Sequence, residues 1–177
     1  LQTDLVYAVN GYTNTYGDIW RWKDILATNS QITSVYGALY NVIGRCNFLL
    51  DNVDKVRESI HDDEDFDRLE QYRGEAHFAR ALAYSELIKL FCEAYDSDEM
   101  AEKALGVVLR TKYYSDEPLV RASLKDSYAF VIKDLEEAED CLQLTDAEEK
   151  DASLTFYDNP YFCIYTVYAL RARVALY

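Results

Sequence analysis

Apolar and small residues recur along residues 66–95 in steps of three and four, which is the spacing of one face of an α-helix. This face consists of Leu69, Tyr72, Ala76, Ala79, Ala83, Leu87 and Leu90. Four of these seven residues are Ala or Tyr. Small side chains let a neighbouring helix come close, and an aromatic ring beside them fills the remaining space. The pattern therefore predicts a helix that packs within a stack of helices.

Three further segments are predicted to be helical. Residues 34–57 keep the helical period for nearly seven turns. Ser123 followed three residues later by Asp126 is a variant of the capping box and predicts a helix that starts there and runs to about residue 142. Pro160 suits the first position of a last helix. The predicted inner face of that helix is Tyr161, Ile164, Tyr165, Tyr168 and Ala172, followed by Ala175 or Leu176.

The connection between the second and third helices, residues 96–122, is long and contains an extended-looking stretch at 106–111. Connections of this length in a helical protein are often functional. Because the chain has only six Gly and two Pro, many short strands joined by tight turns are disfavoured. We expect an all-α fold in which antiparallel helix pairs stack as in tetratricopeptide arrays. We expect one domain over residues 1–177, and a fragment of a longer protein, since the chain opens at Leu1 and stops inside a helical pattern.

The net charge of the chain limits the partners that it can bind. The formal net charge is −14, and no cluster of five or more Lys and Arg residues is present. Duplex nucleic acid and anionic lipid would be repelled, so we expect no nucleic-acid partner. No run of 18 uncharged apolar residues occurs that could span a membrane. Neutral ligands and partners with basic patches remain.

Catalytic and metal motifs are not evident. Cys46, Cys92, Cys141 and Cys163 are scattered without ligand spacing, which favours buried thiols over a zinc site. The acid-rich segment 61–67 lacks the loop glycine of a calcium site and is interpreted as a solvated loop. Neither His61 nor His77 has a Ser or Cys partner in a recognisable motif. The sequence predicts no cofactor, no metal and no enzyme.

Four blocks of the chain resemble the SusD/RagB family of outer-membrane nutrient-binding lipoproteins. They cover residues 39–50, residues 74–91, residues 104–111 with 121–123 and 134–138, and residues 168–177. Order and spacing agree over about 140 residues. Two departures affect a loop: residues 92–95 replace the usual Gly-Asp and Pro, and Val108 stands where the family often has Pro.

The resemblance implies a surface-exposed, lipid-anchored protein of the outer membrane that captures a glycan or other oligomeric nutrient. Its implied partner is a TonB-dependent, SusC-like transporter, and the helical part would mainly face that transporter. Contact with the membrane would be only through a lipid anchor outside this chain. Family members run to several hundred residues, and their later part helps build the ligand site.

Sugar binding needs flat aromatic surfaces for sugar rings and amide or guanidinium groups for hydroxyls. The best candidates are Trp20 and Trp22, with Arg21, Asn14 and Asn29 nearby. The competing interpretation is that the two tryptophans fill the core, and that Tyr72, Tyr128, Tyr165 and Tyr168 pack between helices. Two other functions remain open: a pure protein–protein interaction scaffold, and peptide binding in the manner of RagB.

Overall fold

A computed structural model of the chain describes residues 29–143 and 162–177. Pro160 and Tyr161, predicted at the start of the last helix, lie outside these residues. The chain divides into two compact units, Leu1–Ala38 and Leu39–Tyr177, and each is considered by itself. The prediction of a single domain stays a prediction.

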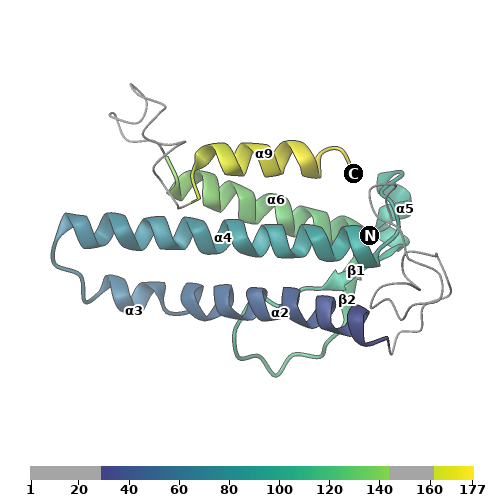
Figure 1. The fold of residues 1–177 in the computed structure, drawn as a ribbon, viewed down its shortest axis with the longest axis horizontal. Helices are drawn as coiled ribbons and strands as arrows, with labels where there is room; N and C mark the ends of the chain where they lie inside the picture. The colour runs from purple at the N-terminus through teal and green to yellow at the C-terminus, as the bar shows by residue number, and fades with distance from the viewer. Residues whose placement is uncertain (1–28, 144–161) are drawn as a thin grey trace, which may run out of the picture. The chain divides into compact units, whose positions relative to one another are not determined.

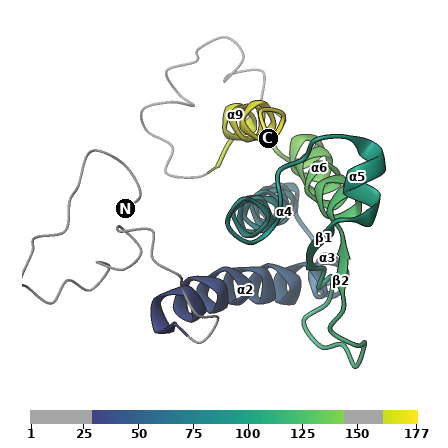
Figure 2. The same ribbon diagram turned by 90° about the vertical axis from the view of Figure 1, so that its right-hand side faces the viewer.

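The described elements are mainly helices (Figure 1). They are α2 (Ser30–Leu50), α3 (Val53–Arg57), α4 (Asp63–Phe91), α5 (Asp98–Lys103), β1 (Leu105–Val108), β2 (Arg121–Ser123), α6 (Leu124–Cys141) and α9 (Ile164–Val174). In the second unit α4, α6 and α9 lie side by side with neighbours antiparallel, and α3 lies on the other side of α4 (Figures 1 and 2). The predicted all-α stack of antiparallel helices is confirmed, with one small two-stranded sheet added.

The predicted helix over residues 34–57 is interrupted. It begins earlier, at Ser30, and α2 ends at Leu50 before α3 starts at Val53. At the break the Asn52 side-chain amide donates to the carbonyl oxygen of Phe48 at 2.7 Å. An amide side chain that bonds a carbonyl at a helix end competes with the helical hydrogen bond, so Asn52 favours termination.

Helix α4 starts inside the acidic segment, not after it. The Asp62 side chain accepts from the backbone N–H of Asp65 at 2.8 Å, and Asp63, Glu64 and Asp65 occupy the first turn. Negative charge is favourable there because the N-terminus of a helix carries partial positive charge. The predicted loop is therefore, from Asp63 on, the first turns of a helix.

The predicted face of α4 is only partly right. Leu69, Ala76, Ala83 and Leu87 are buried, but Tyr72 and Leu90 are exposed. The helix buries a second set of residues: Gly74, Phe78, Arg80, Ala81, Tyr84 and Ile88. A single stripe fails to describe α4 because neighbours cover it on two sides (Figure 2).

Close packing of α4 against α6 depends on a glycine. A Cβ atom on Gly74 would lie 2.7 Å from Cγ of Leu142 and 2.8 Å from Cβ of Cys141. Ala81 and Ala138, also on these helices, are fully buried. The predicted role of small residues in close helix contacts is confirmed for this pair.

Helix α6 begins as predicted. Ser123 Oγ accepts from the backbone N–H of Asp126 at 3.0 Å, which satisfies one of the free donors of the first turn. The helical period of this segment predicts a buried face that includes Leu124, Val131, Ile132, Leu135 and Ala138; all of these are buried except Ile132, which is exposed.

The predicted face of the last helix is right at Ile164 but wrong at Tyr168, Ala172, Ala175 and Leu176, which are exposed. The buried residues of α9 are Ile164, Val167, Leu170 and Val174, whereas Tyr168 is exposed. Two stripes of helical spacing exist in this segment, one aliphatic and one rich in tyrosine. The aliphatic stripe is buried, since a tyrosine also has to satisfy its hydroxyl group when it is buried.

The long connection is more regular than predicted. It contains α5 and then β1, which pairs antiparallel with β2. Gly106 is required in β1, because a Cβ atom there would lie 2.1 Å from Ser127 Oγ and 2.4 Å from the carbonyl oxygen of Ser123. The extended conformation predicted for this stretch is confirmed over Leu105–Val108.

Candidate functional site

Two tyrosines hold the end of β1 and the chain just after it. The Tyr40 hydroxyl donates to the carbonyl oxygen of Val108 at 2.9 Å and accepts from its N–H at 3.1 Å. The Tyr84 hydroxyl does the same for Arg110, at 2.9 Å and 2.7 Å. Each hydroxyl therefore replaces the partner strand that these backbone groups would otherwise need. A proline at position 108 would lack the N–H that Tyr40 accepts.

Asn47 links this backbone to the interior. Its side-chain amide donates to the carbonyl oxygens of Arg110, at 2.9 Å, and Lys112, at 3.3 Å. Its Oδ1 atom accepts from Arg80 Nη1 at 2.7 Å. Asn47 is buried, and these three bonds use its carbonyl oxygen and its amide together.

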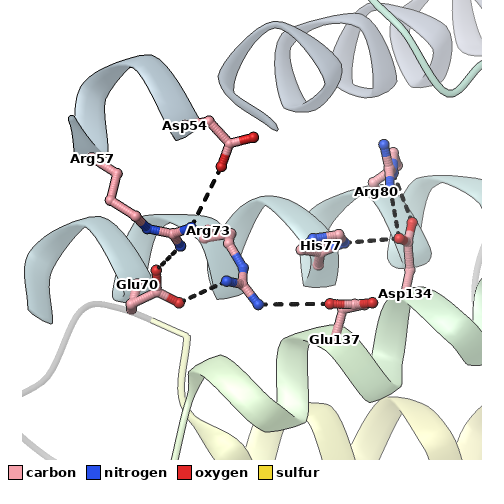
Figure 3. A network of polar contacts seen from close by, with 8 residues as sticks. All are labelled: Asp54, Arg57, Glu70, Arg73, His77, Arg80, Asp134 and Glu137. Carbon is pink, nitrogen blue, oxygen red and sulfur yellow. Dashed lines mark hydrogen bonds and ion pairs between the residues drawn. The ribbon is translucent and has the colours of Figure 1, made fainter. Parts of the chain in front are cut away.

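Arg80 and Asp134 form a buried ion pair between α4 and α6 (Figure 3). Arg80 Nε donates to Oδ2 and Nη2 donates to Oδ1, both at 2.7 Å, which is the paired geometry that suits a guanidinium and a carboxylate. His77 Nδ1 lies 2.9 Å from Oδ1 of Asp134. The guanidinium carbon of Arg80 also lies 5.2 Å from the Phe130 ring centre, within the range of a cation–π contact.

This cluster shifts the protonation of its members. Burial by itself would raise the pKa of Asp134, but hydrogen bonds from Arg80 and His77 outweigh burial and lower that pKa below its ordinary value. Burial opposes the charge on Arg80, yet its bonds to Asp134 leave the Arg80 pKa raised. Burial raises the pKa of the nearby Cys46 thiol to about 11 and of Tyr84 to about 12. The cluster is thus a fixed ion pair beside neutral groups.

A polar pocket of about 470 Å³ opens beside this ion pair, between α3, α4 and α6. Its wall carries a chain of ionic contacts (Figure 3). Arg57 bonds Glu70 at 2.5 Å, Glu70 bonds Arg73 at 2.9 Å, and Arg73 lies 3.6 Å from Glu137. The lining has four carboxylates and four Lys or Arg side chains: Asp51, Asp54, Asp134 and Glu137, and Arg57, Arg73, Arg80 and Lys133.

The pocket is suited to neutral polar ligands. Its formal charges balance, and three of its cations, Arg57, Arg73 and Arg80, already pair with lining carboxylates, so the pocket offers no excess charge of either sign to a charged ligand. Carboxylates and guanidinium groups together can accept from and donate to hydroxyls. A volume of about 470 Å³ lies within the range of small-molecule sites.

The His77–Asp134 contact resembles part of a catalytic dyad, but its surroundings differ from one. Arg80 occupies both oxygens of Asp134, and the Cys46 thiol stays protonated because burial raises its pKa to about 11. Nucleophilic attack by cysteine requires the thiolate. Over residues 29–143 and 162–177, no group of three or more His, Cys, Asp and Glu side chains is arranged to hold a metal ion.

Of the predicted ligand residues, only Asn29 lies in the described part of the chain. Trp20, Trp22, Arg21 and Asn14 lie outside the described residues, so their role stays a prediction. Asn29 lies at the start of α2, where its Oδ1 accepts from the N–H groups of Gln31 and Ile32 at 3.0 and 3.3 Å. Asn29 therefore acts as the N-cap of α2.

Sequence reasoning missed Asn47, Arg80 and Asp134 as a unit. The available signal was positional: Arg80 stands between Ala79 and Ala81, and Asp134 lies one turn from Val131 and Ala138 on the buried stripe of α6. An arginine and an aspartate on the inner faces of two helices predict a pair, since buried charges are rarely left single.

The sequence model of one protein family matches residues 3–176 of the chain. The matching family is SusD-like, described as starch-binding and associating with the outer membrane. The chain belongs to the SusD-like family. The resemblance found in the sequence is thereby confirmed.

Solved structures show the same fold. A protein from Bacteroides vulgatus that carries the provisional name of a sugar-binding protein has a TM-score of 0.72, with 23% identity over 91% of this chain and 32% of its own. A SusD superfamily protein from Bacteroides fragilis has a TM-score of 0.71, with 21% identity over 92% of this chain and 34% of its own. A SusD superfamily protein from Bacteroides thetaiotaomicron has a TM-score of 0.61, with 24% identity over 80% of this chain and 28% of its own.

The chain therefore spans about a third of the length of these SusD-like structures. No curated protein matches the sequence. The family description names a binding function and no reaction. In the part of the chain that the structure describes, no helix is long and apolar enough to cross a membrane.

Proposed function

We propose that this chain is the helical part of a non-catalytic, oligosaccharide-binding protein of an outer-membrane uptake system. The observation that carries the proposal is the SusD-like family match over residues 3–176, with its description as starch-binding and associating with the outer membrane. The charge-balanced polar pocket supports it, because neutral polyhydroxylated ligands need donors and acceptors without net charge.

In this proposal the helices act mainly as a scaffold that faces a TonB-dependent, SusC-like transporter. The parent protein lies exposed on the outer membrane and is held there by a lipid anchor. The well-packed α4–α6 pair supports a scaffold role, because rigid elements hold a binding surface at low entropic cost. No nucleic acid and no cofactor take part.

Isothermal titration calorimetry of the chain tests the binding function. The panel contains neutral starch-derived oligosaccharides, other neutral oligosaccharides, a charged oligosaccharide and oligopeptides. We expect binding of at least one neutral oligosaccharide and none of the charged one. Loss of this binding in Trp20→Ala or Trp22→Ala would assign those tryptophans to the ligand site.

Two results support other functions. Binding of oligopeptides alone supports peptide capture in the manner of RagB. No binding across the panel, together with capture of the chain by a purified SusC-like transporter, contradicts ligand binding by this chain and supports a pure protein–protein interaction scaffold.

A further inference from the structure

Three aromatic side chains gather on the surface where α2 ends. Phe48 is 55% exposed, Tyr113 is 40% exposed and Tyr114 is 83% exposed. The ring centres of Phe48 and Tyr113 lie 5.2 Å apart, and those of Tyr113 and Tyr114 lie 4.5 Å apart, both in edge-to-face geometry. Apolar rings packed together yet open to water form a preformed contact surface. We call Phe48, Tyr113 and Tyr114 the aromatic cluster.

The cluster stands on a rigid base. The backbone N–H of Tyr113 donates to Oδ2 of Asp51 at 2.8 Å. The preceding carbonyl, of Lys112, accepts from Asn47, which in turn accepts from Arg80 of the buried ion pair. The backbone below the exposed rings is therefore fixed by a chain of bonds that leads into the core. Preorganised rings lose little entropy when a ligand binds.

The cluster also adjoins the polar pocket. Asp51, which holds Tyr113, lines the pocket, as does Thr111, two residues before Tyr113. Phe48 lies near the end of α2, three residues before Asp51. The backbone that carries the aromatic cluster is thus bonded to the wall of a cavity that offers carboxylate, guanidinium and hydroxyl groups.

We propose that the aromatic cluster is a stacking platform for one ring of a neutral oligosaccharide whose neighbouring unit enters the polar pocket. This assignment rests on the proposed function and names contact residues for it. A sugar ring has an apolar face that stacks on aromatic rings and a rim of hydroxyls that needs donors and acceptors. The balanced charges of the pocket favour a neutral sugar over an anionic one.

The test is calorimetric titration of the whole chain with a neutral oligosaccharide that the unmodified chain binds. Tyr114→Ala is the main variant, because a side chain that is 83% exposed contributes little to folding. We expect its Kd to rise about tenfold, the effect of losing about 1.4 kcal/mol of stacking. Tyr114→Trp should retain the affinity, because it keeps a flat ring.

The matched control is Tyr168→Ala on α9, since Tyr168 is 47% exposed and belongs to neither the cluster nor the lining of the pocket. We expect an unchanged Kd. Thermal unfolding checks that the variants stay folded.

An unchanged Kd in Tyr114→Ala, with loss of binding in Trp20→Ala or Trp22→Ala, overturns the platform and leaves the proposed function standing. Equal weakening in Tyr114→Ala and Tyr168→Ala also overturns it. Failure of the unmodified chain to bind any neutral oligosaccharide overturns both.

Discussion

Helix α4 packs against its neighbours through different kinds of side chain on its two sides. Toward α6, the contact is close and uses small residues: Gly74, Ala81 and Ala138 are buried, and a buried ion pair, Arg80 with Asp134, crosses it. Toward the part of α2 that begins at Leu39, the contact is made by large polar side chains. Tyr40 and Tyr84 meet edge to face with ring centres 6.4 Å apart, and they bond the backbone at the end of β1 and just after it.

This difference shows how one helix serves two purposes. Small residues let α4 and α6 pack so closely that no other group fits between them, so this contact supplies rigidity. Tyrosine and asparagine instead leave room for a third chain segment and satisfy its N–H and C=O groups. Asn47 and Arg80 connect the two sides, so the surface beside Tyr113 is tied to the same ion pair that joins α4 to α6.

The largest expected effect comes from breaking the ion pair. Asp134→Ala leaves Arg80 buried without its charge partner, which costs about 3–5 kcal/mol of unfolding free energy. Urea denaturation measures this loss. The control is the double variant Arg80→Met with Asp134→Leu, which should recover much of the stability because no buried charge remains. A loss below about 1 kcal/mol in Asp134→Ala would show that the pair is solvated, as surface pairs are.

Gly74→Val tests the close contact on the α6 side. Its Cβ would meet Leu142 and Cys141 at less than 3.0 Å, so α4 and α6 must move apart. We expect a loss of about 2–3 kcal/mol in urea denaturation. Gly44→Val is the matched control, since Gly44 is also helical and nothing lies within 4 Å of the Cβ position there. Equal losses in the two variants would mean that helix propensity, and not close packing, explains Gly74.

Tyr84→Phe tests the α2 side. The ring remains, but the N–H and C=O groups of Arg110 lose their partner in a part-buried position. We expect a loss of about 1–2 kcal/mol, less than on the α6 side because the backbone segment can shift toward water. Ser85→Ala, which removes only a bond to the carbonyl of Leu82 in the same helix, should cost little in the same denaturation experiment. Equal stability of Tyr84→Phe and the unmodified chain would contradict the role given to its hydroxyl.

Alkaline pH should weaken the fold through Cys46. The folded pKa of Cys46 is raised to about 11 from an ordinary 9.0, so its neutral thiol stabilises the fold fully below pH 9. This contribution, about 3 kcal/mol for a pKa raised from 9.0 to about 11, is lost as the pH rises from 9 to 11. Urea midpoints of the unmodified chain should fall over that window. In Cys46→Ala the fall should be shallower and confined to higher pH, where Tyr84 titrates. Parallel curves for both chains would refute the assignment to Cys46.

Much of the fold is predictable because its signals are local. The Ser123 cap and the stripe Leu124, Val131, Leu135 and Ala138 define α6 without tertiary information. Errors arose where a choice depends on neighbours. On α9, the aliphatic and the tyrosine-bearing stripe both have helical spacing, and only the contact with α6 decides between them.

The candidate site was less accessible to prediction. Asn47, Arg80 and Asp134 come from three helices, and their pairing depends on how those helices align. The aromatic cluster joins Phe48 to Tyr113 across 65 residues of sequence by packing alone. The sequence-based site, Trp20 and Trp22, rests on residue type and stays a prediction.

The central claim is that the interior ion pair holds the backbone beneath the aromatic cluster through Asn47. Amide hydrogen exchange in Asn47→Ala tests it most directly, read at the N–H groups of Arg110 and Tyr113 and compared with Val131 in α6. The account predicts faster exchange at Arg110 and Tyr113 with Val131 still protected. Unchanged exchange at Arg110 and Tyr113, or equal acceleration at all three positions, would contradict it.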